Sequence, residues 1–123
     1  MLGTIRNEFI MDSKHIYLEQ NVFKGLKNLN DGFDTKTIKY FSETDFRVVL
    51  ERVEKLKITI HGIEPWKDGQ FYDVLTSEDF NLKENKGEWY WEAFNKFIGM
   101  KIELQYAASY EVSEELLDND KSA

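Results

Sequence analysis

Two β-type runs on either side of an Asp-Gly pair constrain this chain more than any other stretch. Residues 57–76 read KITIHGIEPWKDGQFYDVLT, and both halves are rich in β-branched and aromatic side chains. Asp-Gly between two such runs is the strongest short-range signal for a β-hairpin. The stretch therefore predicts an antiparallel hairpin over 57–76 with its tip at Asp68-Gly69.

Two loop lengths are compatible with that tip. A two-residue loop would place Glu64 opposite Asp73, and two like charges directly opposite each other destabilise a sheet. A three-residue loop, residues 67–69 with Gly69 in the left-handed conformation, shifts the pairing by one residue and separates the carboxylates. The repulsion favours the three-residue loop, and we expect a bulged or edge-like hairpin tip that carries Glu64, Trp66, Lys67 and Asp68; the register itself stays open.

The approach to the tip contains Pro65, which has no N–H to donate to a ladder and so favours an edge strand or a bulge. Trp66 follows it, and two interpretations stay open for this side chain. It either anchors a partner protein as a rigid aromatic group or folds over Phe71 as a cross-strand pair.

Two segments carry a single apolar stripe at helical spacing. In the first, Ser42 and Asp45 form an N-terminal capping motif, and in the second Gly87 opens the helix and Gly99 caps its C-terminus. Trp91 falls at the edge of the second stripe and is the aromatic residue least explained by core packing. The stripes consist of Phe46, Val49, Leu50, Val53 and Leu56, and of Trp89, Tyr90, Ala93, Phe94, Phe97 and Ile98.

Three weaker elements complete the pattern. Leucine and valine at helical spacing predict a helix from Ser13 to about residue 29, and Asn30-Asp31-Gly32 then breaks the chain. Residues 101–112 alternate strictly between apolar and polar side chains, which predicts an antiparallel strand with one solvent-facing side. Ser113 caps a short helix within residues 113–118.

Together these elements predict an α+β domain. We expect an antiparallel sheet of about three to five strands, including the 57–76 hairpin and the 101–112 strand, with helices packed on one face. The length of 123 residues fits one domain over 1–123. Residues 1–11 are then an extension or a short strand, and residues 119–123 a mobile tail.

The net charge of −7 comes from the second half of the chain. Residues 58–123 hold six Lys/Arg against fourteen Asp/Glu (−8), whereas residues 1–57 hold ten against nine (+1). An acidic surface attracts basic partners and repels nucleic-acid phosphates and anionic membranes. We therefore expect a basic protein partner and neither nucleic acid nor membrane. Independently of the charge, a homo-oligomer stays open. The alternative account of the acidity is solubility.

Several kinds of chemistry are excluded or disfavoured. Cysteine is absent, which rules out a disulfide, a thiolate zinc site and a cysteine nucleophile. No phosphate-binding loop, dinucleotide fingerprint or metalloprotease motif occurs, and the pair His15 and Glu19 offers too few ligands for a metal. We expect no cofactor and no metal. Without a membrane span or a secretory signal, the expected location is the cytoplasm.

Two hypotheses of function remain. In size, acidity and lack of a catalytic signature the chain is similar to bacterial immunity proteins as a broad class, which implies a non-enzymatic, immunity- or antitoxin-type inhibitor of a basic partner. The alternative is a small hydrolase or transferase whose acid–base site consists of His61, Glu64 and Asp73. The expected binding residues of the first hypothesis are Glu64, Trp66, Lys67, Asp68 and Trp91.

Overall fold

The computed structural model describes residues 13–68, 70–71, 75–76 and 88–122, and within them the fold is α+β, as predicted. None of the helices in these ranges is both long and apolar enough to span a membrane. In chain order the elements are α2 (Ser13–Asn21), α3 (Glu43–Leu56), β1 (Thr59–Lys67), β2 (Gln70–Phe71), β3 (Leu75–Thr76), α4 (Glu88–Gly99), β4 (Gln105–Glu111) and α5 (Glu114–Ser122).

Strand β1 is the centre of the sheet. β4 pairs with it in antiparallel fashion over its full length, from Thr59 opposite Glu111 to Trp66 opposite Gln105. Among the described residues, the other edge of β1 carries only the two-residue strands β2 and β3. The sheet is therefore essentially a two-stranded ribbon of β1 and β4, and the prediction of about three to five strands was wrong in this respect.

The hairpin has the shorter of the two loops that the sequence left open. Lys67 pairs with Gln70, so the loop has two residues, and Asp68 adopts the left-handed conformation (φ 54°) that such turns require. Farther along, Ile63 pairs with Leu75, although the register at the tip would place it opposite residue 74. The register thus shifts by one residue between these two pairings.

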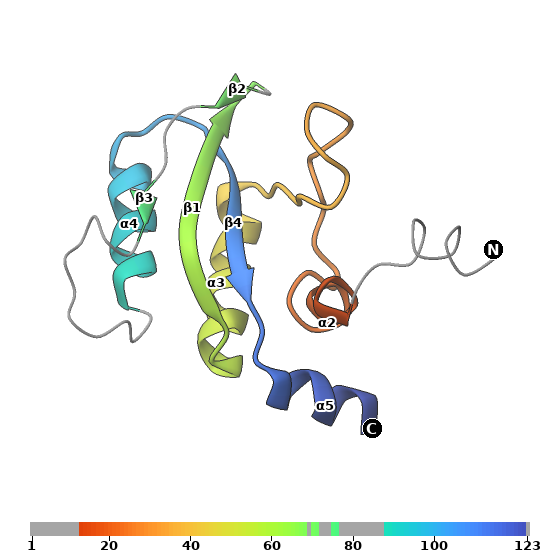
Figure 1. The fold of residues 1–123 in the computed structure, drawn as a ribbon. Helices are drawn as coiled ribbons and strands as arrows, with labels where there is room; N and C mark the ends of the chain where they lie inside the picture. The colour runs from red at the N-terminus through yellow and green to blue at the C-terminus, as the bar shows by residue number, and fades with distance from the viewer. Residues whose placement is uncertain (1–12, 69, 72–74, 77–87, 123) are drawn as a thin grey trace.

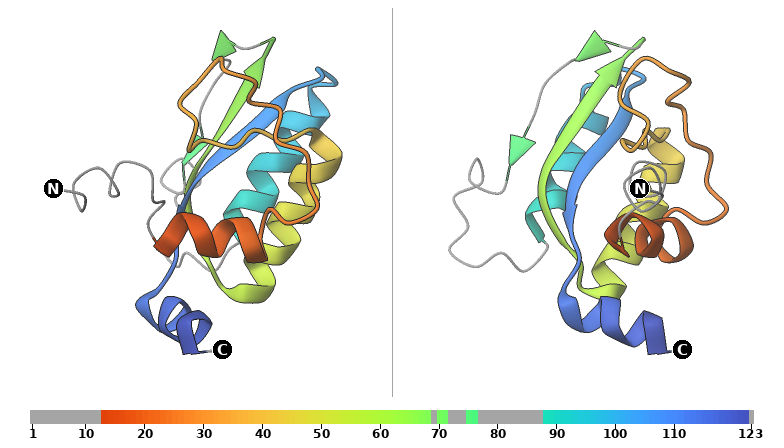
Figure 2. Two further views of the ribbon diagram at one scale, coloured as in Figure 1. Left: turned by 90° about the vertical axis from the view of Figure 1, so that its right-hand side faces the viewer. Right: turned by 45° about the vertical axis from the view of Figure 1, so that its right-hand side comes forward.

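Helices α3 and α4 lie against one face of the ribbon (Figures 1 and 2). The side chain of Ser42 accepts a hydrogen bond from the backbone N–H of Asp45, which confirms the predicted cap of α3. Lys57 ends the helix in the left-handed conformation (φ 59°), and its neighbour Ile58 donates to the carbonyl of Val53. The chain then enters β1 directly, so this cap sets the direction of the central strand.

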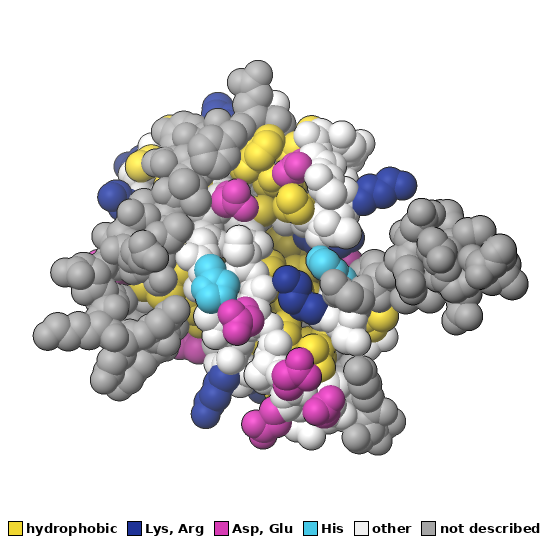
Figure 3. All heavy atoms as spheres, viewed as in Figure 1, with side chains coloured by type: hydrophobic (Ala, Val, Ile, Leu, Met, Phe, Trp, Pro, Cys, Tyr) yellow, Lys and Arg dark blue, Asp and Glu magenta, His cyan; other side chains and the backbone are white. Residues whose placement is uncertain are grey.

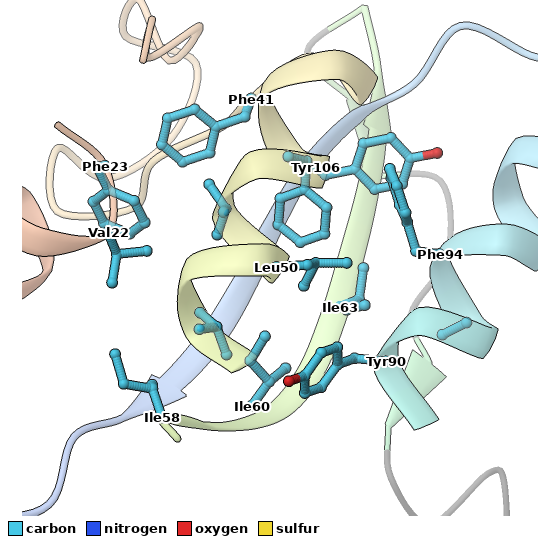
Figure 4. Packing of buried hydrophobic residues seen from close by; sticks show 14 of the residues in the cluster. Val22, Phe23, Phe41, Leu50, Ile58, Ile60, Ile63, Tyr90, Phe94 and Tyr106 are labelled. Carbon is cyan, nitrogen blue, oxygen red and sulfur yellow. The ribbon is translucent and has the colours of Figure 1, made fainter. Parts of the chain in front are cut away.

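The core fills the space between these two helices and the ribbon (Figure 4). Leu50 and Phe94 are fully buried, as their positions in the stripes predicted. Tyr106 of β4 is also fully buried and stacks on Phe46 with ring centroids 5.2 Å apart. Its edge contact with Phe94, at 5.1 Å, joins the strand to both helices.

Four predicted element ends need correction. Helix α2 stops at Asn21 because the chain turns soon afterwards through Gly25, whose φ is +82°. Gly99 is the last residue of α4 rather than its cap, and Lys101 takes the left-handed conformation instead. Strand β4 begins only at residue 105, and α5 continues to residue 122, so residues 119–122 are helical and not a tail.

The alternation along β4 is confirmed with one exception. Leu104, Tyr106 and Val112 are buried on the helix side, and Ser109 and Glu111 are exposed. Ala107 is one of the alternate residues that were expected to face solvent, but it is fully buried. Its methyl group is shorter than the side chains around it. The predicted loop of residues 77–86 and the extension of residues 1–11 lie outside the described residues.

Candidate functional site

The face of the ribbon turned away from α3 and α4 is called here the open face, because no helix of the described chain lies over it (Figures 1 and 2). The pairing of β1 with β4 shifts between Ile60 and Gly62, which leaves His61 as the extra residue of a β-bulge. The bulge brings the His61 side chain to the open face. Glu64 and Trp66, two residues apart farther along β1, point to the same face.

His61 has a carboxylate partner, although not one that the sequence indicated. Its Nε2 lies 2.7 Å from Oε1 of Glu111 on β4, and both side chains are more than half exposed. Within the described part of the chain, no hydrogen bond or ion pair joins His61 to Glu64. Asp73, the third candidate of the acid–base site, lies outside the described residues.

Trp66 packs against aromatic residues that precede α3. Its ring centroid lies 5.2 Å from that of Tyr40, in edge geometry, and 5.6 Å from that of Phe33. The rings of Phe33 and Tyr40 are themselves 4.8 Å apart, so the three rings form a closed triangle. Tyr40 is buried, whereas Phe33 and Trp66 are partly exposed.

The segment that contributes Phe33 and Tyr40 is a loop wound around the side chain of Asn30. The Asn30 amide donates to the carbonyls of Asp34, Thr35 and Ile38 at 3.3, 2.9 and 2.8 Å. Its carbonyl oxygen accepts from the backbone N–H groups of Gly32 and Asp34. Side-chain amides of this kind replace the ladder bonds that a loop lacks.

The base of the same loop is also held together. The carbonyl oxygen of the Asn28 side chain accepts from the N–H groups of Asn30 and Tyr40, and Leu29 donates to the carbonyl of Tyr40 at 2.7 Å. Gly32 has φ +122°, a conformation that other residues rarely adopt, so the turn requires glycine. The backbone that presents Phe33 is therefore fixed by hydrogen bonds at both ends.

Two carboxylates adjoin the aromatic triangle and have opposite pKa shifts. Asp34 accepts a 2.6 Å hydrogen bond from the Tyr40 hydroxyl and a further one from Thr35, and both lower its pKa. Burial, and then the charge of Asp34, raise the pKa of Glu64. Burial, and then Asp34, raise the pKa of the Tyr40 hydroxyl well above its usual range, so it stays a donor.

Glu64 is the unusual member of this group. It is partly buried, yet among the residues that the structure describes no hydrogen bond or ion pair reaches its side-chain carboxylate. A desolvated carboxylate without a cationic partner costs free energy, and in native proteins such groups gather at functional sites. We define Phe33, Asp34, Tyr40, Glu64 and Trp66 as the aromatic–acidic site. Figure 3 shows hydrophobic side chains with acidic ones beside them at the upper end of this face.

The other predicted binding residues lie elsewhere. Lys67 and Asp68 line a cavity of about 530 Å³ between the hairpin tip, the start of α3 and residues 101–105. Two lysines and three carboxylates line that cavity, so neither sign of charge dominates it. Trp91 lies on the helix side of the molecule, where its indole N–H donates to Glu54 of α3 at 3.3 Å. The structure thus brings Glu64 and Trp66 together and leaves Trp91 apart from them.

Sequence reasoning missed Phe33, Asp34, Tyr40 and Glu111. For the first three a signal was present, since closely spaced asparagine, aspartate and glycine in residues 28–34 are typical of an ordered loop built on side-chain hydrogen bonds. Glu111 could be identified as the partner of His61 only from the register of β4 against β1, including the bulge. The alternation of apolar and polar residues does not contain that information.

The described residues include no group of three or more His, Asp or Glu side chains that could hold a metal ion. Aromatic rings and carboxylate oxygens, as found together in the aromatic–acidic site, are groups that can bind an organic cation. Comparison of the chain with protein-family models, with curated proteins and with solved structures finds no match.

Proposed function

We propose that this protein is a binding module for a basic protein partner and that the open face of the β1–β4 ribbon is the contact surface. The observation that carries the proposal is Glu64, a partly buried carboxylate with a raised pKa and no described cationic partner, next to Asp34 and the ring of Trp66. A basic side chain from a partner would supply the missing charge. Folding has already removed part of the water around Glu64, which costs free energy. A basic side chain that pairs with this carboxylate would offset that cost.

The charge around the site supports the same partner. Between Lys101 and Lys121 the chain contains no lysine or arginine. Glu111, Glu114 and Glu115 are exposed in this stretch, and acidic side chains cluster at α5 on the side shown in Figure 3. Acidic side chains on a contact surface accelerate association with an oppositely charged protein.

An inhibitor of a basic enzyme, of the immunity or antitoxin type, is the form of this function that we favour. Such an inhibitor needs an ordered surface rather than catalytic groups, and the hydrogen-bonded loop of residues 28–40 provides one. The competing acid–base site has less support, because His61 is paired with Glu111 in an open, largely exposed position. General acid–base catalysis requires a substrate to be held against the group that transfers the proton.

The experiment compares two double variants with the same change in net charge. Glu64→Lys with Glu111→Lys alters the open face, whereas Glu51→Lys with Glu92→Lys alters exposed positions of α3 and α4 on the other side. A partner is first isolated on the immobilised wild-type protein from the native host at low salt. Its affinity for wild type and for each double variant is then measured with both proteins purified.

We expect the partner to be basic, to dissociate as salt approaches about 1 M, where the screening length falls to about 3 Å, and to lose affinity for the open-face variant alone. Equal losses in the two double variants would mean that overall charge, and not this face, attracts the partner. Recovery of only neutral or acidic proteins would contradict the proposal as a whole.

A further inference from the structure

The aromatic–acidic site has the composition expected for one particular kind of cation. We propose that it binds the guanidinium group of an arginine side chain, which lies on the exposed ring surface of Trp66 and Phe33 and donates its N–H groups to Glu64 and Asp34. This inference deepens the proposed function and rests on it. It names the chemical group of the partner that enters the site.

The carboxylates call for a cation that can pair with two acceptors. Asp34 already accepts from Tyr40 and Thr35, and each of these bonds stabilises its charged form. Glu64 accepts no hydrogen bond from a described residue, and the charge of Asp34 is one cause of its raised pKa. A positive group between the two carboxylates would pair with Glu64, which otherwise lacks a partner. It would also screen Glu64 from the negative charge of Asp34.

The rings favour a flat cation over a compact one. Guanidinium is planar, more weakly hydrated than an ammonium group, and can stack on an aromatic face while its edge donates to carboxylates. A lysine ammonium would lose more hydration at a site that is partly desolvated. The protein contains this kind of contact already, because the Arg47 guanidinium lies 5.3 Å from the ring centroid of Phe94.

Other ligands fit less well. A divalent metal prefers a set of oxygen ligands, and within the described ranges no group of three or more suitable side chains exists. An anionic group would face two carboxylates. A neutral stacking ligand such as a sugar would leave the charge of Glu64 unpaired, so it would not use the feature that distinguishes this site.

The indole N–H signals in a proton–nitrogen NMR spectrum test the proposal at one residue. The protein has three tryptophans, Trp66, Trp89 and Trp91, and the Trp66→Phe variant assigns the relevant signal. The protein is titrated with N-acetyl-arginine amide, with the lysine analogue, and with the citrulline analogue, which has the shape of arginine but no charge. Trp89 and Trp91 serve as internal references, because they lie on α4 away from the open face.

We expect the arginine compound to shift the Trp66 signal while the other two signals stay in place. The lysine compound should need a several-fold higher concentration, and the citrulline compound should have no effect. Loss of the charge-assisted bond in Glu64→Gln should weaken the response by about tenfold or more. The matched variant Glu103→Gln, at an exposed position near the start of β4, should respond like the wild type.

Each alternative outcome has a distinct meaning. Equal responses to arginine and lysine, an effect of citrulline, or an unchanged titration of Glu64→Gln would each overturn the arginine assignment. If arginine leaves Trp66 unmoved while the open-face double variant still loses its basic partner, only the arginine site fails. If arginine shifts Trp66 but the partner binds both double variants equally, the proposed function fails instead.

Discussion

Removal of the Tyr106 hydroxyl should stabilise the protein, which is the opposite of what most substitutions in a core do. The Tyr106 side chain has no exposed surface, and its hydroxyl forms no hydrogen bond with any described group. Burial, followed by the negative charge of Glu43, raises the pKa of this phenol above its usual range, so the group is neutral and still unsatisfied. The Tyr106→Phe variant keeps the ring and removes only the oxygen.

The magnitude follows from two opposing contributions. An unpaired buried hydroxyl costs about 1–3 kcal/mol, whereas the void left by one oxygen atom costs only a few tenths of a kcal/mol. The ring contacts with Phe46 and Phe94, at 5.2 and 5.1 Å, remain in place. We therefore expect Tyr106→Phe to raise the free energy of unfolding by about 1 kcal/mol, and the melting temperature by roughly 3–6 °C for a chain of this length.

Tyr40→Phe is the matched comparison. It also removes one hydroxyl from a buried tyrosine, but this hydroxyl donates to Asp34 at 2.6 Å, so the variant should lose about 1.5–3 kcal/mol. Urea unfolding followed by far-ultraviolet circular dichroism measures both changes, with the slope of the transition unchanged if the denatured state is unaffected. A loss of 1 kcal/mol or more in Tyr106→Phe, or changes of the same sign in the two variants, would refute the reasoning.

Two further predictions concern the helix side and the open face. Phe94→Ala should lose about 3–5 kcal/mol because the ring is fully buried, whereas Trp91→Ala should lose clearly less because Trp91 is partly exposed; equal losses in urea would show that the two sites are equivalent in packing. Glu64 has a raised pKa in the folded state, so its contribution to stability is favourable below its ordinary pKa of about 4.3 and is lost as the pH rises through the folded-state value. Glu64→Gln should therefore be more stable than wild type at pH 7 and equal to it at acidic pH, and a wild type that is the more stable protein at pH 7 would contradict the raised pKa. Asp34 behaves in the opposite sense, because its lowered pKa stabilises the fold above its ordinary value and that contribution disappears as the pH falls through the folded-state value, so Asp34→Asn should destabilise most at neutral pH.

The parts of this fold that could be predicted from sequence are those decided by local periodicity and caps. The position of α3 could be predicted from the apolar stripe that begins at Phe46 and from Ser42. A capping residue and a regular apolar spacing together suffice to indicate a helix. Alternation located β4 and assigned Tyr106 to the core side. Glu64 and Trp66 were singled out for the same reason, since the hairpin signal placed them near its tip.

The rest depended on contacts between distant parts of the chain. The pairing of His61 with Glu111 joins residues 50 positions apart and requires the bulge in β1, which no local pattern announces. Repulsion between Glu64 and Asp73 favoured the longer hairpin loop, but Lys67 pairs with Gln70, so the loop is the shorter one. The loop that carries Phe33 contains no apolar periodicity, because one asparagine side chain takes over the role that a backbone ladder has elsewhere.

The way in which Asn28 and Asn30 hold the loop has a consequence for how this protein could change its specificity. The two asparagines bond mainly to backbone atoms, so the course of the chain from residue 30 to residue 38 depends on them, on Gly32 and on Asp34 more than on the other side chains between them. Asp31, Thr35 and Lys36 are exposed there and take no part in the core. Substitution at these three positions could therefore retune the choice of partner at little cost in stability, as in scaffolds where constant framework residues carry variable loops.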